Sequence, residues 1–144
     1  MIGVKFKISN EYDSVLYKIL KNTNLSSKYI KIFESEVYKK DGNYLFKNDL
    51  YSIADFKNTI KEIYYPVFLK LQFYESNVID EEINNYLEFM KSNCELILFI
   101  IDNIFVEIYS KNTVALDTIV NNLKENNYSE IKTIDYGDIF DGRL

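Results

Sequence analysis

The stretch ELILFIIDNIFVEIYS, from Glu95 to Ser110, decides the fold, because it joins two strongly apolar runs through one polar dipeptide. That dipeptide is Asp102-Asn103, and both residue types tolerate the positive φ of a two-residue hairpin turn. We therefore predict two antiparallel strands that meet at Asp102. In that register one face, which we expect to be the core, consists of Ile97, Phe99, Ile101, Ile104, Val106 and Ile108.

The same hairpin explains the two carboxylates inside this apolar stretch. Asp102 is a turn residue, and Glu107 is a polar position on the opposite face, where Leu98 is its expected neighbour. A catalytic pair is therefore not predicted. The opposite face is otherwise apolar, so helices, a second copy of the chain or another protein must cover it.

Strand and helix patterns alternate along the rest of the chain. Further strands are predicted over residues 4–9, 29–35, 36–40, 44–46, 67–74 and 131–134, with a hairpin turn at Asp41-Gly42. Helices are predicted after Asn10, after the capping pair Ser52 and Asp55, after the acidic run 80–82, and from about Thr113. This order predicts a single α+β domain over residues 1–144. Its mostly antiparallel, twisted sheet would have about six to seven strands, with about four helices on at least one face.

Composition restricts the chemistry that the protein can perform. The chain of 144 residues contains no His and a single Cys, Cys94. Without imidazole, a nucleophile lacks its usual base, and zinc or copper lacks its usual ligands. Glu130 and Lys132 have the acid-x-Lys spacing of some metal-dependent nucleases, but a net charge of −5 disfavours DNA as a partner. We expect no catalytic residue, no metal and no cofactor.

Acidic residues are concentrated in the later part of the chain. Residues 1–47 have nine Lys and five acidic residues, whereas residues 48–144 have eight basic and seventeen acidic residues. The acidic tail, residues 135–144 (DYGDIFDGRL), can pack on its own domain, or it can steer a basic protein partner and bury its aromatic rings there. For the second case the predicted binding residues are Asp135, Tyr136, Asp138, Phe140, Asp141 and Arg143.

Neither an export signal nor a membrane span is expected. Lys5 and Lys7 stand where a signal peptide needs an apolar run. The longest apolar run, residues 96–101, is too short to cross a bilayer. We expect a cytoplasmic protein of a bacterium or a phage-infected cell, with no membrane partner.

The opening GVKFKISNEYDSVLYKIL resembles the start of a family of small proteins from low-GC Gram-positive bacteria, a domain of unknown function. The shared residues are Gly3, Phe6, Ile8, Asn10, Glu11 and Tyr12. The hairpin CELILFIIDNIFVEIYSKN resembles the later half of that family. The resemblance implies one intact α+β domain and carries no activity with it.

Three functions remain open for such a chain. The favoured one is a non-catalytic protein that binds another protein, of the type of an immunity factor or a phage–host conflict inhibitor. The second is a protein that binds or sequesters a small ligand, for which a pocket lined by Tyr and Asn, with Lys for an anion, would be diagnostic. The third is an enzyme that uses carboxylates or Tyr. A homodimer through an apolar sheet face is also compatible with the pattern.

Overall fold

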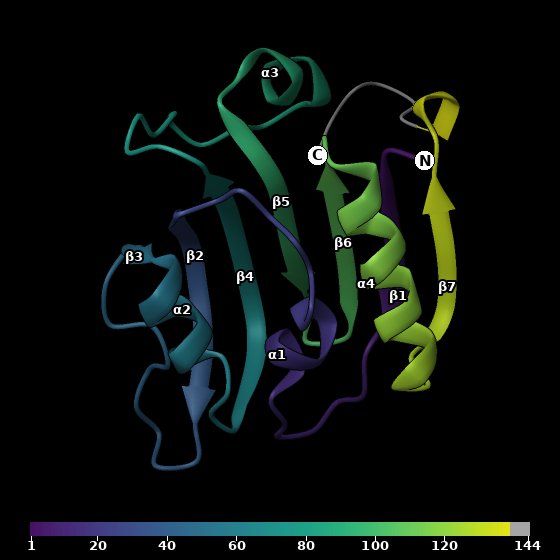
Figure 1. Cartoon of the computed structure of the whole chain (residues 1–144). Helices are drawn as coiled ribbons and strands as arrows, with labels where there is room; N and C mark the ends of the chain where they lie inside the picture. The colour runs from purple at the N-terminus through teal and green to yellow at the C-terminus, as the bar shows by residue number, and fades with distance from the viewer. Residues whose placement is uncertain (139–144) are drawn as a thin grey trace.

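In the computed structural model, which describes residues 1–138, a single antiparallel sheet carries three helices on one face (Figure 1). The strands are β1 (Gly3–Lys7), β2 (Tyr29–Lys39), β3 (Leu50–Ser52), β4 (Tyr64–Tyr74), β5 (Cys94–Ile101), β6 (Phe105–Ser110) and β7 (Ser129–Ile134). The helices are α1 (Val15–Leu20), α2 (Ile53–Thr59), α3 (Tyr86–Lys91) and α4 (Thr113–Glu125), followed by a short 3₁₀ turn, η1 (Tyr136–Asp138). The strand order is β3-β2-β4-β5-β6-β1-β7. The predicted α+β class is confirmed.

The face that carries α1, α2 and α4, here called the helix face, holds the main core (Figure 1). Leu71 of β4, Leu98 of β5 and Ile108 of β6 are fully buried there beneath Leu16 and Leu116 of the helices. β1 runs close against β6, and a Cβ on Gly3 would lie 2.5 Å from the carbonyl oxygen of Ile108. Only glycine fits that position without a shift of the backbone.

The central hairpin is present, but its predicted register is wrong by one residue. Ile101 pairs with Phe105, so three residues form the turn, and Asp102 and Asn103 both have positive φ. A shift of one residue exchanges the two faces of a strand. The residues of the hairpin that face the main core are Leu96, Leu98, Ile100, Val106 and Ile108.

Several other boundaries also differ from the prediction. β2 is one long strand with an irregularity near Glu34, whose φ is +46°, and the predicted strand 44–46 is reduced to a bridge at Tyr44. β4 begins before Pro66, which pairs with β2 only, because the β4–β5 ladder starts at Leu69. The helix expected after Asn10 begins at Val15. The capping pair at α2 is confirmed, since the Ser52 side chain accepts the N–H of Asp55.

The face opposite the helices, here called the second face, is covered only in part. Residues 75–93, which include α3, form a cover segment at the end of the sheet shown uppermost in Figure 1. Its Ile83 and Phe89 pack with Tyr74, Ile97 and other second-face residues in a smaller core. Two large apolar side chains of α3, Leu87 and Met90, are exposed.

Candidate functional site

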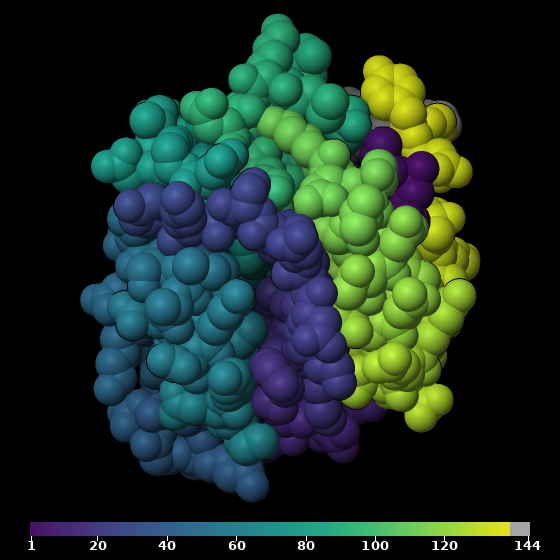
Figure 2. All heavy atoms as spheres, viewed as in Figure 1, coloured from purple at the N-terminus to yellow at the C-terminus, as the bar shows by residue number. Residues whose placement is uncertain are grey.

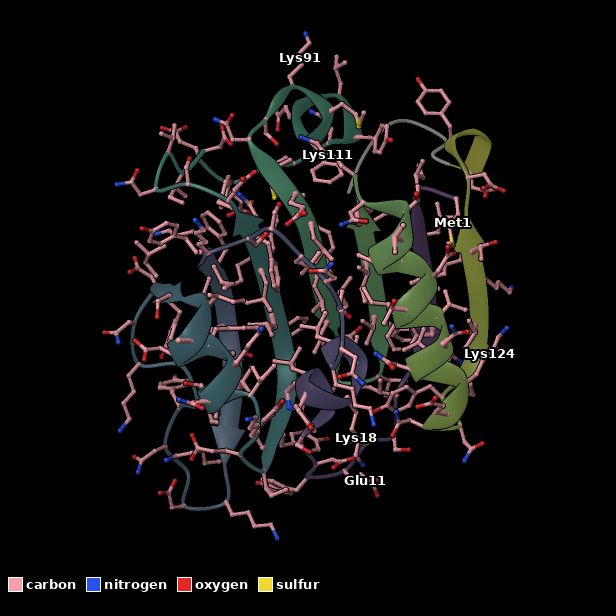
Figure 3. All side chains as sticks on the ribbon, in the orientation of Figure 1. Met1, Glu11, Lys18, Lys91, Lys111 and Lys124 are labelled. Atoms are coloured by element: carbon pink, nitrogen blue, oxygen red, sulfur yellow. The ribbon has the colours of Figure 1, made fainter. Side chains whose placement is uncertain are left out.

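The acidic tail begins on the domain itself. The Asp135 carboxylate lies 3.1 Å from the amino group of Met1, and Asp138 accepts the backbone N–H of Asp135 at 2.7 Å. Figure 3 shows Met1 at the same end of the sheet as η1. The Tyr136 side chain is 73% exposed, and its ring lies edge-on to Tyr86 of α3. Partner binding by these three tail residues stays a prediction.

The other predicted tail residues, Phe140, Asp141 and Arg143, lie outside the described residues.

The acidic residues considered for catalysis do not converge. Asp102 lies in the turn, whereas Glu107 is on the second face and accepts the Tyr109 hydroxyl at 3.3 Å. Glu130 is paired with Lys7 at 2.5 Å, and this hydrogen bond holds the pKa of Glu130 below its usual value. These three carboxylates therefore have separate structural roles.

Cys94 has the environment of a structural thiol. It is fully buried at the start of β5, and its Sγ lies 3.2 Å from the Leu96 carbonyl oxygen. Burial raises the pKa of Cys94 to about 12. Since the thiolate is the nucleophilic form, this side chain is unreactive near neutral pH.

Two polar side chains in the middle of β4 hold the cover segment on the second face. Lys70 is 4% exposed, and its Nζ donates to the Ile83 carbonyl at 2.5 Å and lies 3.1 Å from a Glu82 oxygen. Gln72 is fully buried and accepts the N–H of Ile83 at 2.9 Å. These bonds satisfy both polar side chains without water and fix where the cover segment lies.

The lysine that follows β6, Lys111, holds α3 in place. The Nζ of Lys111 donates to the Ser92 carbonyl at 2.7 Å and lies 5.0 Å from the centre of the Phe89 ring. Lys111 is seen directly below α3 in Figure 3. The cover segment is thus attached to the sheet at Ile83 and at Ser92. It does not reach the rest of the second face, which stays uncovered.

The uncovered part carries an apolar row across three neighbouring strands, here called the open row: Phe68 of β4, Ile101 of β5 and Phe105 of β6. Ile101 and Phe105 are cross-strand partners. Leu69 pairs with Ile100, so Phe68, the residue before Leu69, lies next to Ile101. The three side chains are 38%, 38% and 46% exposed, respectively. These adjoining side chains form an exposed apolar patch on the sheet.

Lysines flank the open row on the side of β1 and β7. Lys7 pairs with Phe105 across the strands, and its Nζ lies 5.3 Å from the centre of that ring. A shallow depression of about 430 Å³ continues from there, and its charged lining consists of Lys5, Lys7, Glu107, Glu130 and Lys132. Three lysines against two glutamates make this side of the open row locally positive on a protein whose net charge is −5.

A cleft of about 330 Å³ opens on the helix face, between α1 and α2. Its third wall is the strap, residues 21–28, which leads from α1 to β2. In Figure 2 the hollow is visible between the dark blue strap and the blue-green surface of α2. Phe56 and Phe73, both 1% exposed, lie at its base.

The walls of the cleft are held by two buried polar side chains. The Tyr64 hydroxyl accepts the N–H of Leu16 at 2.9 Å and donates to the Ile60 carbonyl at 2.8 Å, which ties the start of α1 to the end of α2. Asn122 of α4 donates to the Ile19 and Lys21 carbonyls at 2.9 and 2.8 Å. The end of α1 is therefore fixed to α4, and the cleft is preformed.

Glu95 anchors the strap. Its carboxylate accepts the backbone N–H groups of Ser26 and Ser27 at 3.3 and 3.0 Å, and it also accepts both serine hydroxyls. The sequence shows Glu95 only as the polar start of an apolar strand, and no local pattern connects it with residues nearly seventy positions earlier. The structure thus adds a residue that the sequence analysis missed.

Glu95→Ala should lower the free energy of unfolding by about 2 kcal/mol, because hydrogen bonds to a charged group contribute about 1.5–3 kcal/mol. Urea denaturation measures this loss, and hydrogen exchange should show faster exchange in the strap. Glu95→Gln is the matched control, since it keeps an acceptor oxygen and should lose less. Unchanged stability of Glu95→Ala would show that the strap does not depend on this carboxylate.

Together, the fold and these surfaces define a small α+β protein with an open antiparallel sheet. The chain belongs to the family described as "Protein of unknown function (DUF2691)", which matches residues 1–144. It is similar to "Uncharacterized protein YncE" of Bacillus subtilis (strain 168), with 30% identity over 141 residues, 92% of this chain and 90% of that protein. B. subtilis is a low-GC Gram-positive bacterium, so the resemblance found in the sequence is confirmed.

No solved structure matches the chain significantly. Among residues 1–138, no helix is both long enough and apolar enough to span a bilayer.

Proposed function

We propose that this protein is a non-catalytic, cytoplasmic binding protein of the inhibitor or immunity type, and that it binds another protein through the open row. The exposure of Phe68, Ile101 and Phe105 on three adjacent strands is the observation that supports the proposal. A sheet face is rigid, so a partner that docks there meets a surface that needs little ordering.

The charges beside the open row define the chemistry of the partner. Lys5, Lys7 and Lys132 lie on one side of the apolar side chains. A partner that fits presents an apolar stripe, for example one face of an amphipathic helix, with acidic residues along the side that meets β1 and β7. The apolar stripe would supply most of the affinity, and the charges would set orientation and association rate.

The basic partner predicted from the acidic tail would require a different surface. β7 runs from Ser129, which pairs with Lys7 beside the open row, to Ile134, which pairs with Gly3 at the other end of β1. Asp135 and Asp138 follow Ile134. The tail and the open row thus lie at opposite ends of one strand, and the proposal depends on the open row alone.

Ile101→Lys places a charge at the centre of the open row and should weaken binding of the partner at least about 30-fold, the effect of losing about 2 kcal/mol at a hot spot. The partner is first captured from B. subtilis lysate, then purified and titrated by calorimetry. Leu87→Lys is the matched control, because it also adds one positive charge at an exposed leucine, on α3.

A captured protein supports the proposal only if it binds the wild type and Leu87→Lys equally and binds Ile101→Lys much more weakly. Equal binding by all three proteins would contradict it. Sedimentation of the purified wild type provides a second arm. A dimer that Ile101→Lys dissociates would identify a second copy of the chain as the occupant and would contradict a separate partner.

A further inference from the structure

We propose that the cleft between α1 and α2 is a binding site for a small amphiphilic anion, that is, a molecule with one carboxylate or phosphate group and an apolar body of about one ring. This site is independent of the open row, because it lies on the helix face and the open row on the second face. The inference therefore does not require the proposed protein partner.

The rim of the cleft is suited to an anion. Lys21, Lys57 and Lys61 line it, and none of them has an ion-pair partner among residues 1–138. No acidic side chain is among the described lining residues. Three free ammonium groups around one hollow, on a protein of net charge −5, form a local positive potential that attracts a small anion.

The interior of the cleft is suited to an apolar body. Phe56 and Phe73 meet edge to face at its base, with ring centres 5.5 Å apart. Leu25 and Ile53 add aliphatic surface at the walls. An apolar interior with a few polar groups at the rim, in a preformed hollow of this volume, is the usual form of a small-molecule site.

One unsatisfied polar group lies at the cleft. Thr23 lines the cleft, and its hydroxyl oxygen is buried with no hydrogen-bond partner among the described residues. Buried hydroxyl groups in folded proteins are nearly always satisfied. A carboxylate or phosphate oxygen of the bound anion would accept from this hydroxyl. Tyr17 and Asn22 supply further polar groups at the rim.

The test is a titration of the whole protein with phenyl phosphate, followed by two-dimensional NMR of the backbone amides. Benzyl alcohol is the neutral probe, and inorganic phosphate is the probe without an apolar body. The proposal expects saturable shifts confined to residues 17–25 and 53–61 with phenyl phosphate. It expects binding at least about tenfold weaker for each of the other two probes.

Two variants separate the lysines from a general effect of charge. Lys57→Gln combined with Lys61→Gln should weaken phenyl phosphate binding about tenfold, as two partly exposed ion pairs would. Lys5→Gln combined with Lys132→Gln makes the same change in net charge on the second face and should leave the affinity unchanged. A similar loss in both double variants would overturn the proposal.

Thr23→Val tests the buried hydroxyl without altering the shape of the side chain. It should weaken phenyl phosphate binding several-fold while the protein remains at least as stable as the wild type, because an unsatisfied buried group is removed. Unchanged affinity in this variant, shifts spread over the second face, or binding of benzyl alcohol as strong as that of phenyl phosphate would each contradict the assignment.

Discussion

Leu98→Ala should lower the free energy of unfolding by about 2–5 kcal/mol, whereas Ile101→Ala should cost less than about 1 kcal/mol. Leu98 is fully buried in the main core, between Leu71 of β4 and Ile108 of β6. Ile101 is 38% exposed in the open row. Urea denaturation of the two variants measures both losses. The slope of the free energy of unfolding against urea concentration should be the same as in the wild type.

This pair of variants distinguishes the two registers of the central hairpin. A two-residue turn would place Ile101 in the core and Leu98 on the other face, so the costs would be reversed. An Ile101→Ala loss as large as that of Leu98→Ala would therefore contradict the three-residue turn. Phe99→Ala does not discriminate, because Phe99 is only 8% exposed in the smaller core and is costly to truncate in either register.

Raising the pH above about 10 should unfold the protein cooperatively, because buried tyrosines would have to ionise. Burial is the main cause that raises the pKa of Tyr64, Tyr74, Tyr109 and Tyr128 above 10.0, the ordinary value. A group whose pKa is raised on folding stabilises the native state fully below its unfolded pKa. That contribution is lost as the pH rises above the unfolded value.

Melting temperatures should therefore be nearly constant from about pH 7 to 9 and fall steeply above about pH 10. Phenolate absorbance followed over the same range should rise in a step that coincides with the loss of tertiary structure. Tyr64 contributes most directly, since its hydroxyl also joins α1 to α2. A smooth rise of the full phenolate signal with the fold intact would show that these four side chains titrate in the native state.

Local patterns in the sequence predict the elements but not how the central strands align. The Ser52 cap of α2 and the start of α4 at Thr113 were correctly predicted. Residues 96–101 are all apolar, so alternation gives no signal for which face is inside. Asp102 and Asn103 tolerate positive φ in a two-residue or a three-residue turn, so the turn did not settle the register either.

The surfaces depend on contacts between distant segments, which no local pattern reports. Lys70 and Gln72 alternate with apolar residues in β4 and lie on the face opposite Leu69 and Leu71. Their burial arises from the cover segment, which the pattern did not place. The cleft likewise combines the end of α1, the strap, α2 and Phe73. The sequence could therefore suggest what a ligand pocket would contain, but it could not predict where such a pocket lies.

The position of β1 between β6 and β7 bears on how the chain folds during synthesis. Val4 of β1 pairs with Ile108 and Thr133, so β1 finds its partners only after more than a hundred further residues have been made. Sheets that depend on such distant pairings have high contact order and form slowly. Until then β2, β4 and β5 can assemble as an early meander with exposed apolar edges. Nascent chains halted before β6 should therefore be protease-sensitive at β1 and bind chaperones, and both properties should disappear once β7 has emerged.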